Sequence, residues 1–182
     1  MSRPPRIWFF NRSYWPDSEA TGQLLTELCE DLADDFEMTV FAGHPNHTQP
    51  DQTAGTAIRR GVAIRRLPHT RFNKSSTVGR VANLLTFTAS AFLGTLFRPR
   101  PDLVVTETDP FFLPLLGRWL KFRYRCRFVA YLQDVYPDIA IAVGRARESW
   151  ITRFLRRRLV GAYEHADRVV VVSERMLARC RQ

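Results

Sequence analysis

The sequence contains only three cysteines, Cys29, Cys126 and Cys180, in a chain of 182 residues. Their number is odd and their spacing is wide, so they match neither the disulfide framework of a small secreted domain nor the paired cysteines of a zinc site. We therefore expect reduced thiols. The sequence also lacks internal repeats and low-complexity linkers, which favours a single domain over residues 1–182.

The N-terminus lacks the pattern of a secretory signal peptide, because Pro4, Pro5 and Arg6 lead directly into an apolar run. We therefore expect a cytoplasmic protein. A second segment, residues 81–97, is almost free of charge and resembles a membrane span in composition. It is short for a span and contains several Asn, Thr and Ser residues, so we favour a buried crossover helix.

Glycine-rich phosphate-binding motifs are absent, since the chain has neither the three-glycine dinucleotide fingerprint nor a P-loop. His44 and His47 have two residues between them in a proline-containing loop without a third ligand, so we expect a turn there and no metal site. His69 and His165 have no evident partner for nucleophilic catalysis, and no serine occupies the elbow of a hydrolase.

Charge is distributed unevenly along the chain, whose formal net charge is +9. Acidic residues outnumber basic residues nine to three in residues 1–51, whereas basic residues outnumber acidic residues 24 to nine in residues 52–182. The later part should therefore project a positive field, which requires an anionic partner. Nucleic acid, an anionic membrane surface and a phosphorylated substrate all satisfy this requirement.

Short apolar runs rich in Val, Ile and Phe alternate with longer segments of helical period. Strands are predicted near residues 6–10, 38–42, 62–67, 102–106, 127–132 and 168–172, and helices near 20–34, 77–97, 111–123 and 149–165. A last helix begins after Ser173, where the chain reads as though it stops mid-protein. The pattern predicts an α/β fold: a Rossmann-like, doubly wound, mainly parallel sheet of about six strands with helices on both faces.

Ligands of a doubly wound sheet bind beyond the carboxyl ends of the strands, so the candidate site residues lie in the loops that follow the strands. The candidate substrate contacts are Tyr14, Gly22, Asn46, Arg71, Thr108, Asp109 and Gln133. Gly22 opens the first helix, where free backbone N–H groups and the helix dipole favour phosphate. Relief of crowding between helix and strand explains this glycine equally well.

Two carboxylates follow neighbouring strands. Asp134 comes directly after the strand at 127–132, where it can orient a hydroxyl or transfer a proton, although a turn or helix cap would also use an Asp here. Asp109 precedes Pro110 and an apolar run, so capping of the next helix is favoured over catalysis for it. Asp134 is therefore the candidate catalytic residue.

The helix near 149–165 has apolar residues at helical spacing and arginines on its other side. It either lies on an anionic bilayer or packs its apolar stripe on the sheet with the arginines in water. We favour packing on the sheet for the stripe, and we keep Arg153, Arg156 and Arg157 as candidate membrane-facing residues.

Three segments together resemble one known family. They are the loop from Tyr14-Trp15-Pro16 to Gly22, residues 40–46, and the Gln-Asp-Val-Tyr-Pro run at 133–137. In order and spacing they resemble the N-terminal half of glycosyltransferase family 4, in the branch of colanic-acid, capsule and O-antigen sugar transferases. Residues 166–174 are similar to the family's last N-domain strand and the helix after it.

The resemblance implies the acceptor-side half of a GT-B enzyme, which is retaining, metal-independent and without a tightly bound cofactor. The donor would be a nucleotide sugar, and the acceptor of such enzymes is often a polyprenyl-diphosphate-linked saccharide at the inner membrane face. The family's first loop, matched around Gly22, approaches the donor phosphates. Many members have a His where this chain has Gln133, which makes Asp134 the residue to test.

The family's donor-binding C-terminal domain has no counterpart in these 182 residues. We therefore expect little or no transferase activity from the chain alone. Either the chain is truncated, or it works with a separate donor-domain subunit. The alternative function is a non-catalytic module that binds a membrane or anionic lipid. A nucleic-acid partner is not expected, because no recognition motif with stacking aromatic residues is present.

Overall fold

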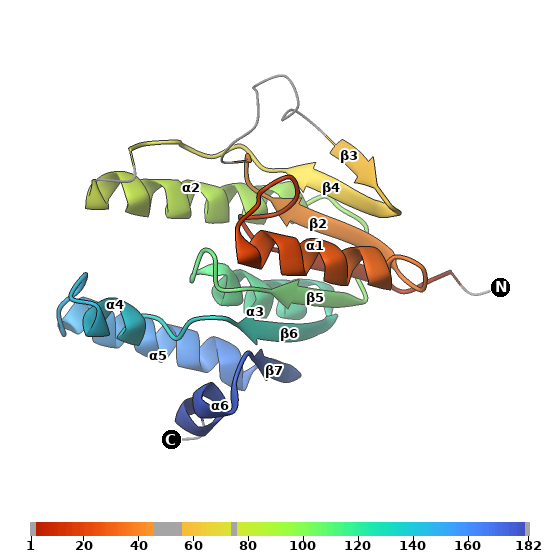
Figure 1. The fold of residues 1–182 in the computed structure, drawn as a ribbon. Helices are drawn as coiled ribbons and strands as arrows, with labels where there is room; N and C mark the ends of the chain where they lie inside the picture. Colours follow the sequence, from red (N-terminus) through yellow and green to blue (C-terminus); the bar gives the residue numbers. More distant parts are fainter. Residues whose placement is uncertain (1–2, 46–55, 74–75, 181–182) are drawn as a thin grey trace.

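Seven strands form one sheet in the order β3-β4-β2-β1-β5-β6-β7 (Figure 1). The structure is a computed structural model that describes residues 3–45, 56–73 and 76–180. All neighbouring strands are parallel except β3 and β4. The strands are β1 (Arg6–Phe10), β2 (Glu37–Ala42), β3 (Thr56–Arg59), β4 (Val62–Arg66), β5 (Leu103–Thr106), β6 (Arg127–Leu132) and β7 (Arg168–Val171).

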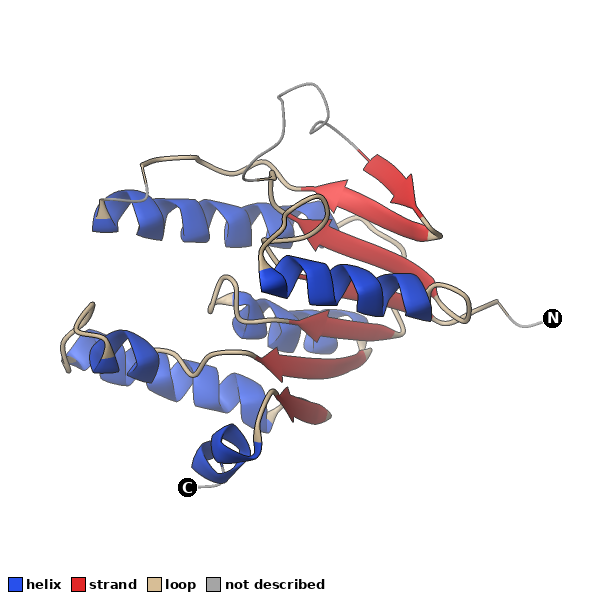
Figure 2. Ribbon diagram, viewed as in Figure 1, coloured by secondary structure: helices blue, strands red, loops and turns tan. Residues whose placement is uncertain are grey.

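Helices cover both faces of this sheet (Figure 2). In the view of Figure 1, α1 lies in front of the sheet, whereas α2, α3 and α5 lie behind it. The helices are α1 (Ala20–Leu32), α2 (Thr77–Thr95), α3 (Leu113–Tyr124), α4 (Asp138–Ala142), α5 (Trp150–Glu164) and α6 (Glu174–Cys180). The predicted doubly wound α/β fold is confirmed, and Ser173 caps α6 by accepting a hydrogen bond from Met176 N–H at 3.2 Å.

The expected strand count of about six is one too low, because β3 was not recognised. β3 pairs antiparallel with β4 through a tight turn at Arg60 (φ 43°) and Gly61 (φ 80°). Its first three residues are exposed, so it carries little of the apolar signal that marks the buried strands. The short helix α4 was likewise missed, within a segment expected to be a loop.

Two layers of buried side chains hold the helices on the sheet. On the α1 face, Leu25 and Cys29 pack with Phe9 and Val40. On the opposite face, the strand residues Trp8, Phe10, Phe41 and Phe128 form one cluster with Phe87 of α2 and with buried leucines of α3. The rings of Phe10 and Phe41 stack with centroids 4.6 Å apart. Alternate residues of each strand supply the two layers, as expected of a sheet covered on both faces.

The crossover helix α2 is not buried, contrary to the expectation for residues 81–97. One side, which includes Phe87 and Ala91, is fully buried against the sheet, whereas Val78, Leu85 and Leu93 on the other side are exposed. No helix in the described part of the chain has the length and apolar character needed to span a membrane.

Candidate functional site: an arginine-lined pocket at the carboxyl ends of the strands

The candidate site lies where the strand order reverses. The chain passes from β1 to β2 on one side of β1, and β5 pairs with its other side. In open doubly wound sheets, ligands bind outside the carboxyl ends of the strands at such a switch point. Here the loops that follow β1, β5 and β6 meet the start of α2 at that position.

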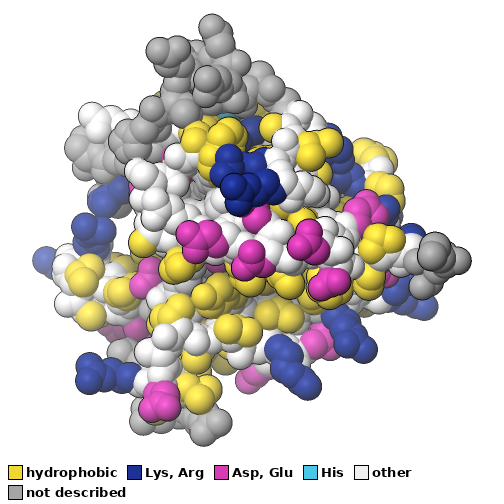
Figure 3. All heavy atoms as spheres, turned by 45° about the vertical axis from the view of Figure 1, so that its right-hand side comes forward, with side chains coloured by type: hydrophobic (Ala, Val, Ile, Leu, Met, Phe, Trp, Pro, Cys, Tyr) yellow, Lys and Arg dark blue, Asp and Glu magenta, His cyan; other side chains and the backbone are white. Residues whose placement is uncertain are grey.

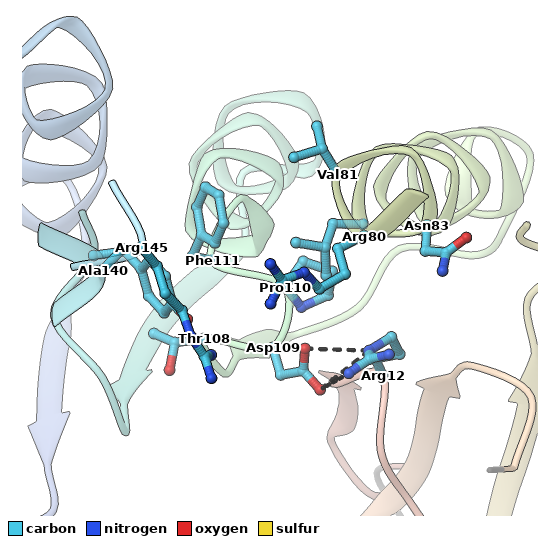
Figure 4. Close-up of a pocket in the computed structure, with 12 residues that line it drawn as sticks. Arg12, Arg80, Val81, Asn83, Thr108, Asp109, Pro110, Phe111, Ala140 and Arg145 are labelled. Atoms are coloured by element: carbon cyan, nitrogen blue, oxygen red, sulfur yellow. Dashed lines mark hydrogen bonds and ion pairs between the residues drawn. The ribbon is translucent and has the colours of Figure 1, made fainter. Parts of the chain in front are cut away.

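A pocket of about 340 Å³ opens at this switch point. We call it the switch-point pocket. Its volume is at the lower end of the range of small-molecule sites. Arg12 and Arg145 approach it from opposite sides, and Arg80 reaches it from α2 (Figure 4). The other lining residues are Val81, Asn83, Leu84, Thr108, Asp109, Pro110, Phe111, Tyr136 and Ala140.

Arg12 and Asp109 form the central ion pair of the pocket. Arg12 Nε lies 3.2 Å from each carboxylate oxygen of Asp109, and Nη2 lies 3.1 Å from Oδ2. Arg12 N–H also donates to the Asp109 carbonyl at 2.7 Å. Burial disfavours the Arg12 cation, but the charge and hydrogen bonds of Asp109 outweigh it, so the pKa of Arg12 is raised.

Asp109 does not cap the following helix, contrary to the sequence-based interpretation. The N-cap of α3 is Phe112, without a side-chain hydrogen bond. The carboxylate of Asp109 points instead toward Arg12 in the loop that follows β1 (Figure 4). Asp109 therefore lines the pocket with its charge already paired, and its role as a substrate contact stays a prediction.

Phe111 and Tyr136 form an aromatic wall of the switch-point pocket. Their rings stack at 4.5 Å between centroids and 17° between planes. Burial, followed by the nearby charges of Asp134 and Asp109, raises the pKa of the Tyr136 hydroxyl. The wall therefore presents an apolar face and a neutral hydroxyl, and a sugar ring can pack on such a surface.

Thr108 fixes the loop after β6. Its Oγ1 accepts hydrogen bonds from the N–H groups of Gln133 and Asp134, both at 3.2 Å. Thr108 also lines the switch-point pocket, whereas Asp134 lines a neighbouring pocket of about 280 Å³ together with Asp138 and Ser173. The structure thus brings Thr108 and Asp109 into one pocket and places Asp134 at the edge of the next.

Arg71 lies in a third pocket, of about 400 Å³, which shares Arg12 with the switch-point pocket. His44 and His69 stack here with centroids 5.3 Å apart. Burial and the neighbouring arginines lower the pKa of His44, and burial with a smaller contribution from Arg12 lowers the pKa of His69. Both imidazoles are therefore neutral near pH 7. Of the described residues, no three His, Cys, Asp or Glu side chains are close enough to hold a metal ion.

Two predicted contacts lie away from these pockets. The side chain of Tyr14 is completely buried, so it supports the loop from within the core. Gly22 lies in α1, where an added Cβ would be 3.2 Å from Ser13 Oγ and 3.4 Å from the Asp17 carbonyl oxygen, so the helix packs closely here on the loop after β1 and not on a strand. Ser13 Oγ donates to the carboxylates of Asp17 and Glu19 beside this helix start. Asn46 lies outside the described residues.

Glu107, at the carboxyl end of β5, is an unexpected buried carboxyl. It is 1% exposed, and its Oε2 has no hydrogen-bond partner within the described chain. Burial, with a contribution from Asp109, raises its pKa to about 8, so the carboxyl is mostly protonated at neutral pH. The sequence alone gave no reason to separate Glu107 from the other acids of the loop.

The three candidate membrane-facing arginines differ in their surroundings. Arg156 forms ion pairs with Asp138 at 2.7 Å and Glu148 at 3.1 Å, which tie α4 and the following loop to α5. Arg153 and Arg157 are exposed and form no ion pair within the described part of the molecule. Arg156 thus has a structural role that the other two lack.

Residues 20–182 match the model of the glycosyl transferase 4-like domain. The chain belongs to this family. No curated protein matches the sequence. The resemblance drawn from the sequence is therefore confirmed at the level of the family and the fold.

The sequence did not point to several residues that line the switch-point pocket of this glycosyl transferase 4-like domain. Arg12 is the second residue after β1, and this position after a strand could have marked it as a candidate site residue. Arg80 lies in α2 and Arg145 follows α4. Both are far in sequence from Arg12 and from the loop after β5, so only the fold brings these residues into one pocket. Phe111 was quoted with its loop, but its stacking on Tyr136 depends on the neighbouring strands β5 and β6.

Proposed function

We propose that this domain binds the acceptor in a nucleotide-sugar-dependent glycosyl transfer that builds cell-surface polysaccharide or lipid-linked glycan. The observation that carries the proposal is the pocket at the switch point, which three arginines line in a domain of glycosyltransferase type. The arginine guanidinium group matches the geometry of phosphate oxygens and forms charge-assisted hydrogen bonds with them. A diphosphate-linked saccharide fits this chemistry.

Three arginines line the switch-point pocket. Arg12 is held by Asp109, so its positive charge is largely balanced. Arg80 and Arg145 are the other cations that line the pocket. We assign the acceptor diphosphate to these two side chains, and its first sugar to the Phe111–Tyr136 wall.

The donor nucleotide sugar would be held by a second domain that faces the switch-point pocket, either in the same polypeptide or in a partner subunit. Asp134 remains the candidate acid or base, because it lines the adjoining pocket and its charge helps to raise the pKa of the Tyr136 hydroxyl. Gln133 stays a candidate substrate contact, with its backbone N–H already bonded to Thr108. We propose a location at the inner face of the cytoplasmic membrane.

Calorimetric titration tests the acceptor assignment without a transfer reaction. The ligand is a water-soluble, short-chain prenyl-diphosphate saccharide, and the comparison is the same saccharide without the diphosphate. Arg80→Gln and Arg145→Gln should each weaken binding about tenfold or more, because each removes charge-assisted hydrogen bonds. Arg60→Gln, in the exposed turn after β3, is the matched control and should leave binding unchanged.

Two results would overturn the assignment. Equal affinity for the saccharides with and without diphosphate would show that the arginines do not read phosphate. Loss of affinity in Arg60→Gln equal to that in Arg145→Gln would show a nonspecific charge effect. A protein that binds vesicles but no saccharide would instead support the non-catalytic lipid-binding module.

A further inference from the structure

The helix α2 has an apolar side that faces away from the sheet. Val78, Leu85 and Leu93 follow one another at intervals of seven and eight residues, which places them on one stripe of the helix. Leu93 is 62% exposed, and Leu85 and Val78 are exposed as well. An α2 that only connected two strands would carry polar residues on this side.

Aromatic side chains extend this apolar surface onto the neighbouring helix. Phe97, just after α2, is 96% exposed and Phe122 of α3 is 84% exposed. Trp119 of α3 joins the two helices by packing on Phe92, with ring centroids 4.4 Å apart. Large apolar side chains gathered in this way on an outer surface mark an interaction site.

A groove of about 1020 Å³ with a strongly basic lining runs beside Phe122. None of its lining residues is acidic; they are Leu115, Arg118, Trp119, Lys121, Phe122, Arg123, Arg125, Arg158 and His165. Lys121 is paired with Asp167 at 2.8 Å. The four arginines form no ion pair within the described residues.

The two faces of the domain have opposite charge. The helices α2 and α3 contain no acidic residue, and Glu164 is the single acid of α5. On the other face, α1 contains three acids and no base, and carboxylates form a row across that side in Figure 3. The helices α2, α3 and α5 therefore carry eight basic residues against one acidic residue, and α2 exposes its apolar side on this face.

We propose that the outer surface of α2, α3 and α5 docks on an anionic lipid bilayer. The stripe of α2, with Phe97 and Phe122, enters the interfacial region, and Arg118 and Arg123 contact lipid phosphates. A second copy of the chain does not fit this surface symmetrically, because two basic faces would repel each other. The docking contact thus lies on α2 and α3, beside the arginines of α5.

The docking surface is continuous with the switch-point pocket through α2. Arg80 and Leu84 of α2 line the pocket, while Leu85 faces outward. Val81 lines the pocket and is itself exposed. A lipid-linked acceptor in the pocket would therefore have its lipid at the docking surface; this last step rests on the proposed function, whereas the docking itself does not.

Vesicle co-sedimentation of the full chain tests the docking surface without any saccharide. The vesicles contain phosphatidylglycerol mixed with phosphatidylcholine, or phosphatidylcholine alone. We expect binding to the anionic vesicles, weakened by salt, and much weaker binding to the neutral ones. Leu93→Glu should weaken binding at least about tenfold, and Arg118→Gln and Arg123→Gln about fivefold each.

Leu24→Glu is the matched control, because Leu24 of α1 is also 62% exposed but lies on the acidic face. It should leave vesicle binding unchanged, and circular dichroism should show the same fold for both variants. Equal losses in Leu24→Glu and Leu93→Glu, or absent binding of the wild-type chain, would overturn the proposal. The proposal would also be overturned if inorganic phosphate released the protein from vesicles more than chloride of equal ionic strength does. A dimer of the chain that Leu93→Glu dissociates would overturn it as well.

Vesicle binding and saccharide binding separate this proposal from the proposed function. Arg145→Gln should weaken binding of the diphosphate-linked saccharide about tenfold or more while vesicle binding persists. Leu93→Glu should weaken vesicle binding while saccharide binding persists. Loss of vesicle binding alone would remove the docking surface and leave the acceptor assignment standing.

Discussion

Arg12 and Asp109 join two loops that are 97 residues apart in the sequence. Side-chain and backbone hydrogen bonds act together, since Arg12 N–H also donates to the Asp109 carbonyl. The pair links the ends of β1 and β5, where the two halves of the sheet diverge. It therefore sets the shape of the switch-point pocket as well as its charge.

Asp109→Ala should destabilise the domain by about 1–3 kcal/mol, because it leaves the half-buried Arg12 cation without its partner. Urea unfolding followed by circular dichroism measures the change. Arg3→Ala removes the more exposed pair with Asp102 and should cost about 0–1 kcal/mol. Equal effects of the two substitutions would contradict the importance assigned to the Arg12–Asp109 pair.

Glu107 should make the stability of the domain depend on pH. Its folded-state pKa of about 8 lies above the ordinary value of 4.5, so the folded state binds the proton more tightly than the unfolded state. The stabilisation by this group is complete below about pH 4.5 and is lost as the pH rises through about 8. The loss over this range should be on the order of 5 kcal/mol.

Urea unfolding of the wild type and of Glu107→Gln across this pH range isolates the contribution, since histidines and other acids titrate in both proteins. The Gln variant keeps a neutral side chain, so its advantage over the wild type should grow with pH. Parallel stability curves for the two proteins would show that Glu107 is ionised in the folded state or titrates normally.

The sequence predicted the fold well because the buried strands are continuous apolar runs. Residues 6–10 and 127–132, for example, match β1 and β6 in their bounds. The prediction failed for β3, whose exposed residues carry no such run and whose pairing is set by the turn at Arg60 and Gly61. It also failed for the outer side of α2, because composition shows that a helix is apolar but not which side is covered.

The candidate site was predictable only in part. The position rule for doubly wound sheets pointed to the loop after β5, where Thr108 and Asp109 line the switch-point pocket. The rule does not distinguish side chains that point into a pocket from those that point into the core, and Tyr14 belongs to the second kind. Arg145 follows a short helix in a segment with no periodic signal, so its approach to Arg12 appears only in three dimensions (Figure 4).

Gly117 marks the closest approach of α3 to the sheet. An added Cβ would lie 2.2 Å from Phe128 Cε2, and both residues are buried. Gly117→Ala should therefore destabilise the domain by about 2–3 kcal/mol through overpacking. Gly94→Ala is the matched control in α2, where the Cβ would meet only the flexible end of Leu67 at 3.2 Å.

Thermal unfolding followed by circular dichroism compares the two glycine variants. Gly94→Ala should be neutral or stabilising by up to about 1 kcal/mol, because alanine favours the helix over glycine. Similar melting temperatures for both variants would mean that α3 moves away from Phe128 at little cost.

Arg156 should behave differently from Arg153 and Arg157, although all three lie on the basic side of α5. Arg156→Gln breaks the ion pairs with Asp138 and Glu148, and because these groups are partly exposed the loss of stability should be about 1 kcal/mol. High salt should reduce that difference. Arg153→Gln and Arg157→Gln should leave stability unchanged but weaken binding to phosphatidylglycerol vesicles about fivefold each, because their charges are available to lipid phosphates.

Urea unfolding and vesicle co-sedimentation of the same three variants test this difference between the arginines. A different result would be that Arg156→Gln loses as much vesicle binding as the other two variants while its stability stays at the wild-type value. The charge of Arg156 would then serve the membrane surface, and the ion pairs would not hold α4 to α5.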